Sequence, residues 1–159
     1  MSEFTHLDGS GQAHMVDVTH KQPTVRAAVA EGFVECAPLV VEALRDGAVP
    51  KGDVLAVARI AGIAAAKRTP ELLPLAHVIG VHGVTLDAVV EDSGVRLTAR
   101  VSTADRTGVE MEALTAVSVA ALNVVDMVKG LDKSTSIRQV RLLAKEGGKS
   151  GTWERPAGS

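Results

Sequence analysis

The sequence predicts an α+β fold in which helices pack on one face of an antiparallel sheet. Two stretches that alternate between apolar and polar residues, joined by a turn, are typical of a β-hairpin. A long uncharged stretch rich in Ala and Val is typical of a buried helix. The chain has 159 residues, of which 46% are apolar, and this is enough for one domain with its own core.

The first elements are a strand and a short helix. Residues 24–36 fit either a helix or a strand, and the strand is favoured because Gly32 would interrupt the helix. Residues 38–44 predict a short helix that ends at Asp46.

The next predicted helix covers residues 54–67, and its apolar residues are spread over most of its surface. Asp53 is the predicted N-cap, because an aspartate there accepts a hydrogen bond from the free N–H groups of the first turn. Pro70 is predicted to stop the helix.

Residues 77–90 and 95–102 then alternate around the turn 91–94, as in a hairpin with one wet face. The long helix over 108–129 and a last strand at 137–143 complete the order strand, helices, strand, strand, helix, strand. This βαββαβ order is that of the ferredoxin-like class.

Composition excludes several functions. The net charge is −2 and aromatics are 2% of residues, which argues against nucleic-acid binding. The only cysteine, Cys36, is expected to be a buried small side chain. No signal peptide is recognised, and no uninterrupted apolar run reaches about 18 residues, so no membrane segment and a cytoplasmic location are expected. The many small apolar residues favour a homo-oligomer.

Asp126 and Lys129 lie three residues apart and share a helix face, about 60° from each other. An acid and a base at one end of a buried helix are suited to proton transfer. The alternative is an ordinary surface ion pair.

Glu110 and Glu112 allow two interpretations. If residues 108–112 are extended, as Gly108 favours, both carboxylates point to one side; if they are helical, the two diverge by about 160°. Alternatively, the two charges only complement the positive end of the helix dipole.

The loop from Lys145 to Gly151 ends in a fragment of a P-loop, but position 143 is Leu and no helix follows, so a P-loop is excluded. Its glycines and its lysines, Lys145 and Lys149, remain candidates for holding an anion. Other cations at predicted turns are individually typical of a solvated surface, but together suit a polyanion: Lys21, Arg26, Lys51, Lys67 and Arg68. No metal-ligand or nucleotide-cofactor motif is present, so neither metal nor cofactor is expected.

Several segments together resemble the MoaC family of molybdenum cofactor biosynthesis, over roughly residues 14–151. The matching segments are His14-Met-Val-Asp-Val18, Lys51-Gly-Asp-Val54, Ala58-Arg-Ile-Ala-Gly-Ile63, Ala66-Lys-Arg-Thr69, Leu73-Pro-Leu75 with His77, Gly108-Val-Glu-Met-Glu-Ala-Leu-Thr115, Asp126-Met127 with Lys129, and Lys145 with Gly147-Gly-Lys-Ser-Gly151. The expected organisation is therefore a flexible tail (1–13), one MoaC-like domain (14–151) and a C-terminal tail (152–159).

The resemblance implies a lyase. Such a lyase converts (8S)-3′,8-cyclo-7,8-dihydroguanosine 5′-triphosphate, made by a radical SAM enzyme, into cyclic pyranopterin monophosphate and pyrophosphate. It also implies a hexamer built as a trimer of dimers, with the site at a subunit interface.

The resemblance also implies roles for individual residues. Asp126, Lys129 and Lys51 would be catalytic. The substrate-binding residues would be Leu75, Ala76, His77, Met111 and Glu112, with Glu110, Arg26, Lys67, Lys145 and Lys149 as further candidates from charge and position.

The family usually has Cys-His-Pro where this chain has Ala76-His-Val78. This departure supports an alternative hypothesis, in which the protein is a catalytically weak paralogue that binds a nucleotide or pterin in a regulatory role. A purely structural oligomer is the third hypothesis.

Overall fold

The structure, a computed structural model, describes residues 5–159 and contains five strands and four helices in this range. In chain order the elements are β1 (Thr24–Glu35), α1 (Pro38–Arg45), α2 (Val54–Ala66), α3 (Thr69–Leu72), β2 (Gly83–Glu91), β3 (Gly94–Asp105), α4 (Glu110–Val128), β4 (Ser136–Glu146) and β5 (Trp153–Glu154).

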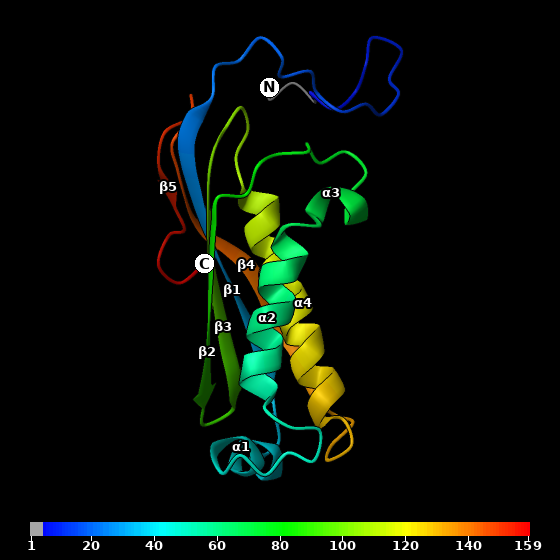
Figure 1. Cartoon of the computed structure of the whole chain (residues 1–159), viewed down its shortest axis with the longest axis vertical. Helices are drawn as coiled ribbons and strands as arrows, with labels where there is room; N and C mark the ends of the chain where they lie inside the picture. The colour runs from blue at the N-terminus through cyan, green and yellow to red at the C-terminus, as the bar shows by residue number, and fades with distance from the viewer. Residues whose placement is uncertain (1–4) are drawn as a thin grey trace.

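The strands form one antiparallel sheet in the order β2-β3-β1-β4-β5. The first four have the ferredoxin-like arrangement, so the predicted fold class is confirmed. In Figure 1, α2 and α4 lie side by side along one face of the sheet, while α1 and α3 lie near its opposite ends.

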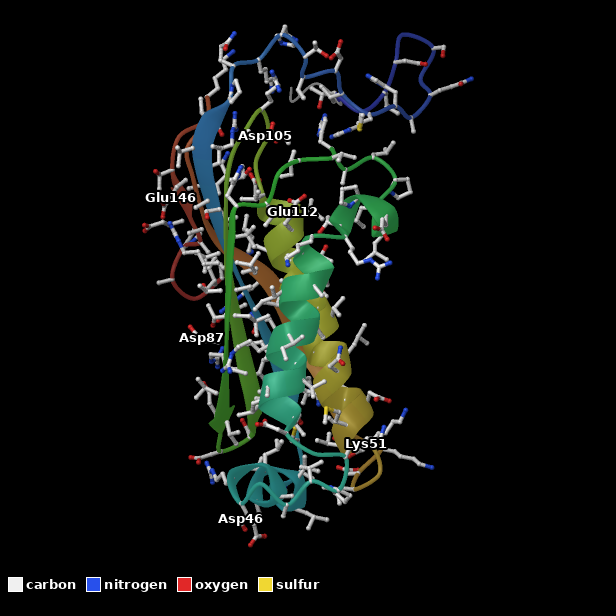
Figure 2. All side chains as sticks on the ribbon, viewed as in Figure 1. Asp46, Lys51, Asp87, Asp105, Glu112 and Glu146 are labelled. Atoms are coloured by element: carbon white, nitrogen blue, oxygen red, sulfur yellow. The ribbon has the colours of Figure 1, made fainter. Side chains whose placement is uncertain are left out.

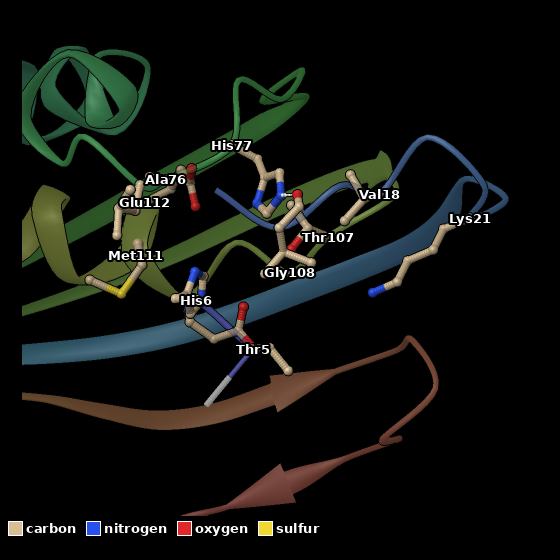
Figure 3. A pocket seen from close by; sticks show the side chains of 13 residues that line it. Thr5, His6, Val18, Lys21, Ala76, His77, Thr107, Gly108, Met111 and Glu112 are labelled. Atoms are coloured by element: carbon tan, nitrogen blue, oxygen red, sulfur yellow. Dashed lines mark hydrogen bonds between the residues drawn. The ribbon is translucent and has the colours of Figure 1, made fainter. Parts of the chain in front are cut away.

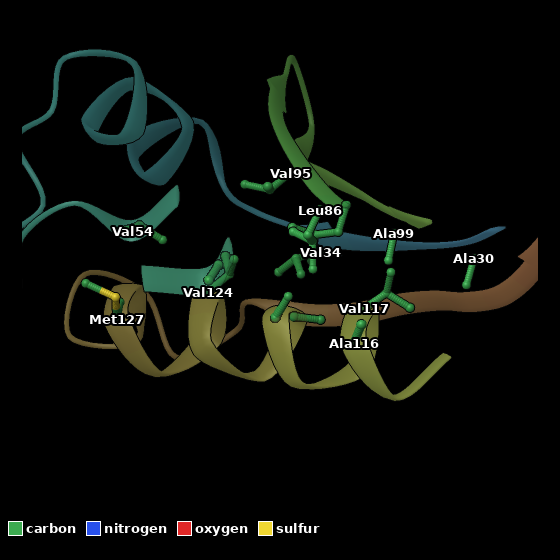
Figure 4. Close-up of a cluster of buried hydrophobic side chains, with 14 of the residues drawn as sticks. Ala30, Val34, Val54, Leu86, Val95, Ala99, Ala116, Val117, Val124 and Met127 are labelled. Carbon is green, nitrogen blue, oxygen red and sulfur yellow. The ribbon is translucent and has the colours of Figure 1, made fainter. Parts of the chain in front are cut away.

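Alternation along the strands places their apolar residues under the helices. On β3 the inward residues Val95, Leu97, Ala99 and Val101 are fully buried, as predicted for this half of the hairpin. The core is built almost entirely from small residues, and within residues 5–159 Leu97 is the largest side chain that is fully buried. Figure 4 shows residues of β1, β2 and β3 meeting those of α4 in this core.

Small residues also let the two long helices approach closely. A Cβ atom at Gly62 of α2 would lie 2.8 Å from the carbonyl oxygen of Ala116 on α4 and 2.3 Å from Leu86 Cδ1. Glycine is therefore required here by space, because no other residue leaves room for α4.

Local signals for the helices are mostly confirmed. The strand interpretation of residues 24–36 is correct. Asp53 caps α2, since its Oδ1 accepts the N–H of Ala56 at 3.0 Å. Helix α2 ends at Ala66, before Pro70. Pro70 itself lies in the first turn of the next short helix, α3, where its missing N–H costs nothing.

Helix α4 is long and apolar enough to cross a membrane by length and composition, with a mean hydropathy of 1.5. This does not contradict the expectation of no uninterrupted apolar run of about 18 residues, because Glu112 and Asp126 interrupt the apolar stretch of α4. However, 56% of the stretch is buried within the protein, against the sheet and α2. It is the core helix of the domain, as its uncharged stretch rich in Ala and Val predicted.

Two segments differ from the prediction. Strand β2 begins at Gly83, since its pairing with β3 starts at the Gly83–Ser102 pair, so His77 lies in a loop and not in a strand. At the other end of the chain, residues 152–159 were expected to be a tail. The structure has a short strand there, β5, in which Trp153 pairs with Lys145 of β4. Of the expected N-terminal tail, residues 1–4 lie outside the described residues, and Leu7 and Ala13 form a bridge.

Candidate functional site

Asp126 lies in the last turn of α4 between two lysines. Its Oδ1 is 2.6 Å from Lys129 Nζ, three residues further along. Its Oδ2 is 3.2 Å from Nζ of Lys51, which comes from the loop between α1 and α2. The Lys51 ammonium also donates to the backbone carbonyl of Asp126 at 2.9 Å. The three predicted catalytic residues therefore form one cluster, here called the triad.

The triad is an exposed, strongly polarised group. The side chains of Asp126 and Lys129 are each 55% exposed and that of Lys51 is 48% exposed. Hydrogen bonds from Lys129 and then Lys51 lower the pKa of Asp126, and the two positive charges add to this effect. Asp126 is therefore an ionised carboxylate held in a fixed orientation at neutral pH.

A second site lies at the other end of α4, where a hollow of about 390 Å³, here called the basin, opens beside the first turn of the helix. Figure 3 shows it between the N-terminal segment, the loop that carries His77 and the loop before α4. The residues that line it are Thr5, His6, Val16, Val18, Lys21, Leu75, Ala76, His77, Thr107, Gly108, Glu110, Met111 and Glu112.

Glu112 is the buried acid of the basin. It is 3% exposed. Burial raises the pKa of Glu112 to about 7, and the neighbouring Glu110 carboxylate contributes to the rise. Near neutral pH this group therefore exists in both protonation states, which is what a residue that both gives and takes a proton requires.

The extended interpretation of residues 108–112 is wrong, because α4 begins at Glu110. Two acidic residues in a first turn are favourable next to the free N–H groups there. Both carboxylates still border the basin, because it lies against the end of the helix and not against one face. Glu110 approaches Lys145, with 3.9 Å between its Oε1 and the lysine Nζ.

His77 is held by the N-terminal segment. Its Nε2 lies 2.6 Å from the carbonyl oxygen of Val16. Since a carbonyl only accepts, Nε2 must carry the proton, and Nδ1 of the neutral ring is then an acceptor. The neighbouring N–H of Ala76 is already used by the carbonyl of Leu73, at 3.0 Å.

A second hollow, the cationic cleft, adjoins the basin through Lys21, which lines both. It measures about 830 Å³ and is lined by Lys21, Gln22, Thr24, Arg26, Gly148, Lys149 and Ser150. Lys145 lies beside it and hydrogen-bonds Ser150. Four cations near one another form a surface suited to a polyphosphate.

Gly148 shapes this cleft. Its φ of +74° is left-handed, and a Cβ atom there would lie 2.2 Å from Nη1 of Arg26. The guanidinium of Arg26 is held from the other side, where its Nε donates to the carbonyl of Asp105 at 3.2 Å. Glycine thus leaves the space that the Arg26 side chain occupies.

The structure does not bring all the predicted residues together within one chain. Glu112 and Asp126 are fourteen residues apart on one helix, or about 21 Å along its axis. In Figure 2, Lys51 and Glu112 lie at opposite ends of the helical layer. Lys67 caps the C-terminus of α2, at the same end as the basin, but lines neither hollow.

Some lining residues were not predicted. Thr5, His6 and Thr107 carry no motif of their own, Val18 belongs to a matching segment but was given no role, and Lys21 was only one cation among several. They become neighbours because the chain before β1 folds back over the end of α4, and no local pattern indicates this.

Comparison with known proteins agrees with the resemblance. A model described as the MoaC family matches residues 15–148. Curated relatives are named cyclic pyranopterin monophosphate synthase. The one from Streptomyces coelicolor is 62% identical over 152 residues, covering 96% of this chain and 89% of the relative. Those from Thermomicrobium roseum and Pelobacter propionicus are 54% and 53% identical over 157 and 158 residues, covering 98% of this chain and 95% and 98% of the relatives.

Proposed function

The chain belongs to the MoaC family, and we propose that it is a cyclic pyranopterin monophosphate synthase acting in molybdenum cofactor biosynthesis. Its substrate is the cyclised GTP derivative (8S)-3′,8-cyclo-7,8-dihydroguanosine 5′-triphosphate, which a radical SAM enzyme supplies in the cytoplasm. Its products are cyclic pyranopterin monophosphate and pyrophosphate. The observation that carries the proposal is the sequence identity of 62% over 96% of the chain to a relative of that name.

The basin and the cationic cleft suit the two parts of this substrate. The fused ring system enters the basin, where Glu112 and His77 offer groups that exchange protons with ring nitrogens. The triphosphate lies along the cleft, where Lys21, Arg26 and Lys149 offset its charge. Because Lys21 lines both hollows, one ligand reaches across the boundary between them.

A second copy of the chain completes the site. Between the basin and the triad, α2 and α4 expose an apolar strip that includes Ile60 and Leu122, 69% and 58% exposed. A two-fold axis across the middle of α4 buries this strip against its own copy and runs the two α4 helices in opposite directions. The partner's triad then faces the basin of the first chain. Three such dimers form the hexamer.

Proton transfer follows from the two carboxylates. Opening the purine ring and closing the pterin ring requires several transfers to and from nitrogen. Asp126, kept ionised by its lysines, accepts protons or stabilises positive charge. Glu112, with its raised pKa, donates them. The two environments thus separate the base from the acid.

Incubation of the pure protein with the cyclised GTP substrate tests the function. We expect pyrophosphate release and formation of the cyclic monophosphate. Binding without pyrophosphate release would instead favour the regulatory paralogue that the Ala76 and Val78 departures raised.

Mixing two inactive variants tests the shared site. Asp126→Asn and Glu112→Gln are each expected to be inactive alone. In randomly exchanged dimers half are mixed, and each mixed dimer has one intact site of two, so about a quarter of wild-type activity returns. If the site lay within one chain, mixing would restore nothing.

A further inference from the structure

The loop of residues 73–82, between α3 and β2, brings His77 to the basin without being part of the sheet. Apart from His82, whose N–H donates to the Ser102 carbonyl of β3 at 3.0 Å, its backbone groups need partners other than a neighbouring strand. At Gly80 both are supplied by the end of β3. The N–H of Gly80 donates to Asp105 Oδ2 at 3.0 Å, and the hydroxyl of Thr103 donates to the Gly80 carbonyl.

The contact between Gly80 and Thr103 is buried. Thr103 is 2% exposed. The ring of His82 covers Gly80, where an added Cβ atom would lie 3.2 Å from His82 Cε1. His82 in turn accepts the N–H of Ala104 on Nδ1, at 3.2 Å. The loop is thus fixed at Gly80, three positions beyond His77, and again at His82, whose N–H donates to the Ser102 carbonyl at 3.0 Å.

Asp105 joins this loop to the next wall of the basin. Its Oδ1 accepts the N–H of Arg106 at 2.7 Å, so one carboxylate bridges the loop 73–82 and the loop that leads into α4. The hydrogen bonds from Gly80 and Arg106 lower the pKa of Asp105, which keeps it ionised. An ionised carboxylate accepts both bonds at once, one on each oxygen.

Two more contacts meet at the same point. The guanidinium Nε of Arg106 donates to the carbonyl of Lys21 at 2.9 Å. The guanidinium Nε of Arg26 donates to the carbonyl of Asp105 at 3.2 Å. The N-terminal segment and the cationic cleft are therefore tied to the same junction, which Figure 2 shows above Glu112 near one end of the sheet.

We propose that Asp105 is a positioning residue for the reaction: it holds the loop 73–82 so that His77 faces the substrate, and it does not touch the substrate itself. Asp105 is not among the residues that line the basin. This inference rests on the proposed function, because it concerns the same site.

The variant Asp105→Asn separates positioning from stability. The amide keeps the shape of the side chain, but its one oxygen accepts only one of the two N–H groups and its NH₂ faces the other. The loop is then ordered only when substrate binds, so KM rises on the order of tenfold while kcat stays within about twofold. A fall in kcat with unchanged KM would mean less folded enzyme and would overturn the inference.

Thr103→Val tests the same loop from the other side, since it removes the donor to the Gly80 carbonyl and keeps the volume. Because both side chains hold Gly80, the rise in KM of the double variant is expected to be smaller than the product of the single effects. Fully multiplicative effects would show that the two do not act through one loop.

Asp92→Asn is the matched control. Its carboxylate also joins two segments, through Arg45 at 2.7 Å, but at the opposite end of β3. Its KM is expected to match the wild type. A rise equal to that of Asp105→Asn would make the effect general and overturn the assignment.

Amide hydrogen exchange, followed by mass spectrometry, tests the inference without any substrate. Peptides covering residues 73–82 are expected to exchange faster in Asp105→Asn, and peptides of α4 at the wild-type rate. Unchanged exchange in the loop overturns the inference whatever the activity. If the wild type releases no pyrophosphate while the loop is freed in the variant, the proposed function fails and the role of Asp105 in holding the loop stands.

Discussion

The two ends of α4 shift the pKa values of their carboxylates in opposite directions. At the N-terminus, Glu112 is buried and its pKa rises to about 7. At the C-terminus, Asp126 is exposed between two lysines and its pKa is lowered. The helix dipole alone would do the reverse, because it favours negative charge at the N-terminus and disfavours it at the C-terminus.

Magnitudes explain which effect prevails. The rise at Glu112, from 4.5 to about 7, corresponds to about 3 kcal/mol. A helix dipole contributes only about 0.3–1 kcal/mol near the surface. Burial therefore decides the protonation of Glu112, and paired lysines decide that of Asp126. One helix carries an acid and a base because its two ends have different surroundings.

The largest expected effect is that of Asp126→Asn. It removes the ionised group of the triad, and kcat is expected to fall by about 10²–10⁴-fold with the oligomer still formed. Pyrophosphate release measures kcat, and light scattering measures the size of the oligomer. Asp87→Asn, at an exposed position of β2, is the control and should keep normal turnover. Near-normal turnover of the Asp126 variant would contradict its catalytic role.

Glu112→Gln sharpens the comparison through pH. Because the folded pKa of Glu112 is raised, its contribution to stability is fully present below about 4.5 and is lost as pH rises through about 7. The free energy of unfolding of the wild type should therefore fall, by up to about 3 kcal/mol from this residue, between pH 4.5 and 8. Urea titrations at both pH values should show a smaller fall for Glu112→Gln.

Asp126 predicts the opposite sign. Since its folded pKa is lowered, whatever stability it contributes is present above pH 3.8 and is lost as pH falls through its folded pKa. Urea titrations of Asp126→Asn should therefore differ from the wild type near neutral pH and converge with it only as the pH is lowered below 3.8. A pH dependence of the same sign at both carboxylates would break the contrast.

Gly62→Val tests the middle of the helix pair, on which both ends depend. The added Cβ atom would lie 2.8 Å from the Ala116 carbonyl, which is backbone and cannot move away. We expect a loss of about 1–3 kcal/mol in the free energy of unfolding, measured by urea denaturation. Unchanged stability would mean that α2 and α4 tolerate a wider separation.

Gly148→Ala gives the smallest expected effect and should act at the basin end alone. The added methyl group strains a left-handed residue and displaces Arg26, so KM is expected to rise several-fold. Gly130→Ala, where nothing lies within 4 Å of the added atom, is the control at the other end. Equal effects of the two variants would show that Arg26 does not contribute to binding.

Much of the fold was predictable because its signals are local. The Asp53 cap and the alternation of Val95 to Val101 each depend on residues a few positions apart. The start of β2 was not predictable, because the pattern of residues 77–82 also resembles a strand. In the structure, β2 pairs with β3 only from the Gly83–Ser102 pair to the Glu91–Gly94 pair. The sequence pattern records which side chains are apolar, and not where a partner strand ends.

The candidate site divides in the same way. The pairing of Asp126 with Lys129 follows from helix geometry. The family resemblance named Lys51, but its contact with Asp126 depends on the turn before α2 and is given only by the structure. For Glu112 the sequence suggested an extended chain, and the structure has a helix with the carboxylate buried. Burial results from neighbours distant in the chain, which spacing does not reveal.

By itself, the sequence determined the order of the elements, the core helix and the family, since these depend on periodicity, capping and recognisable motifs. Only the tertiary structure decided that Glu112 and Asp126 lie at opposite ends of α4 with opposite pKa shifts, and that one aspartate at the end of β3 joins two walls of the basin. The physical reason is that proton affinity and loop position are set by contacts between segments far apart in the chain, and these exist only once it has folded.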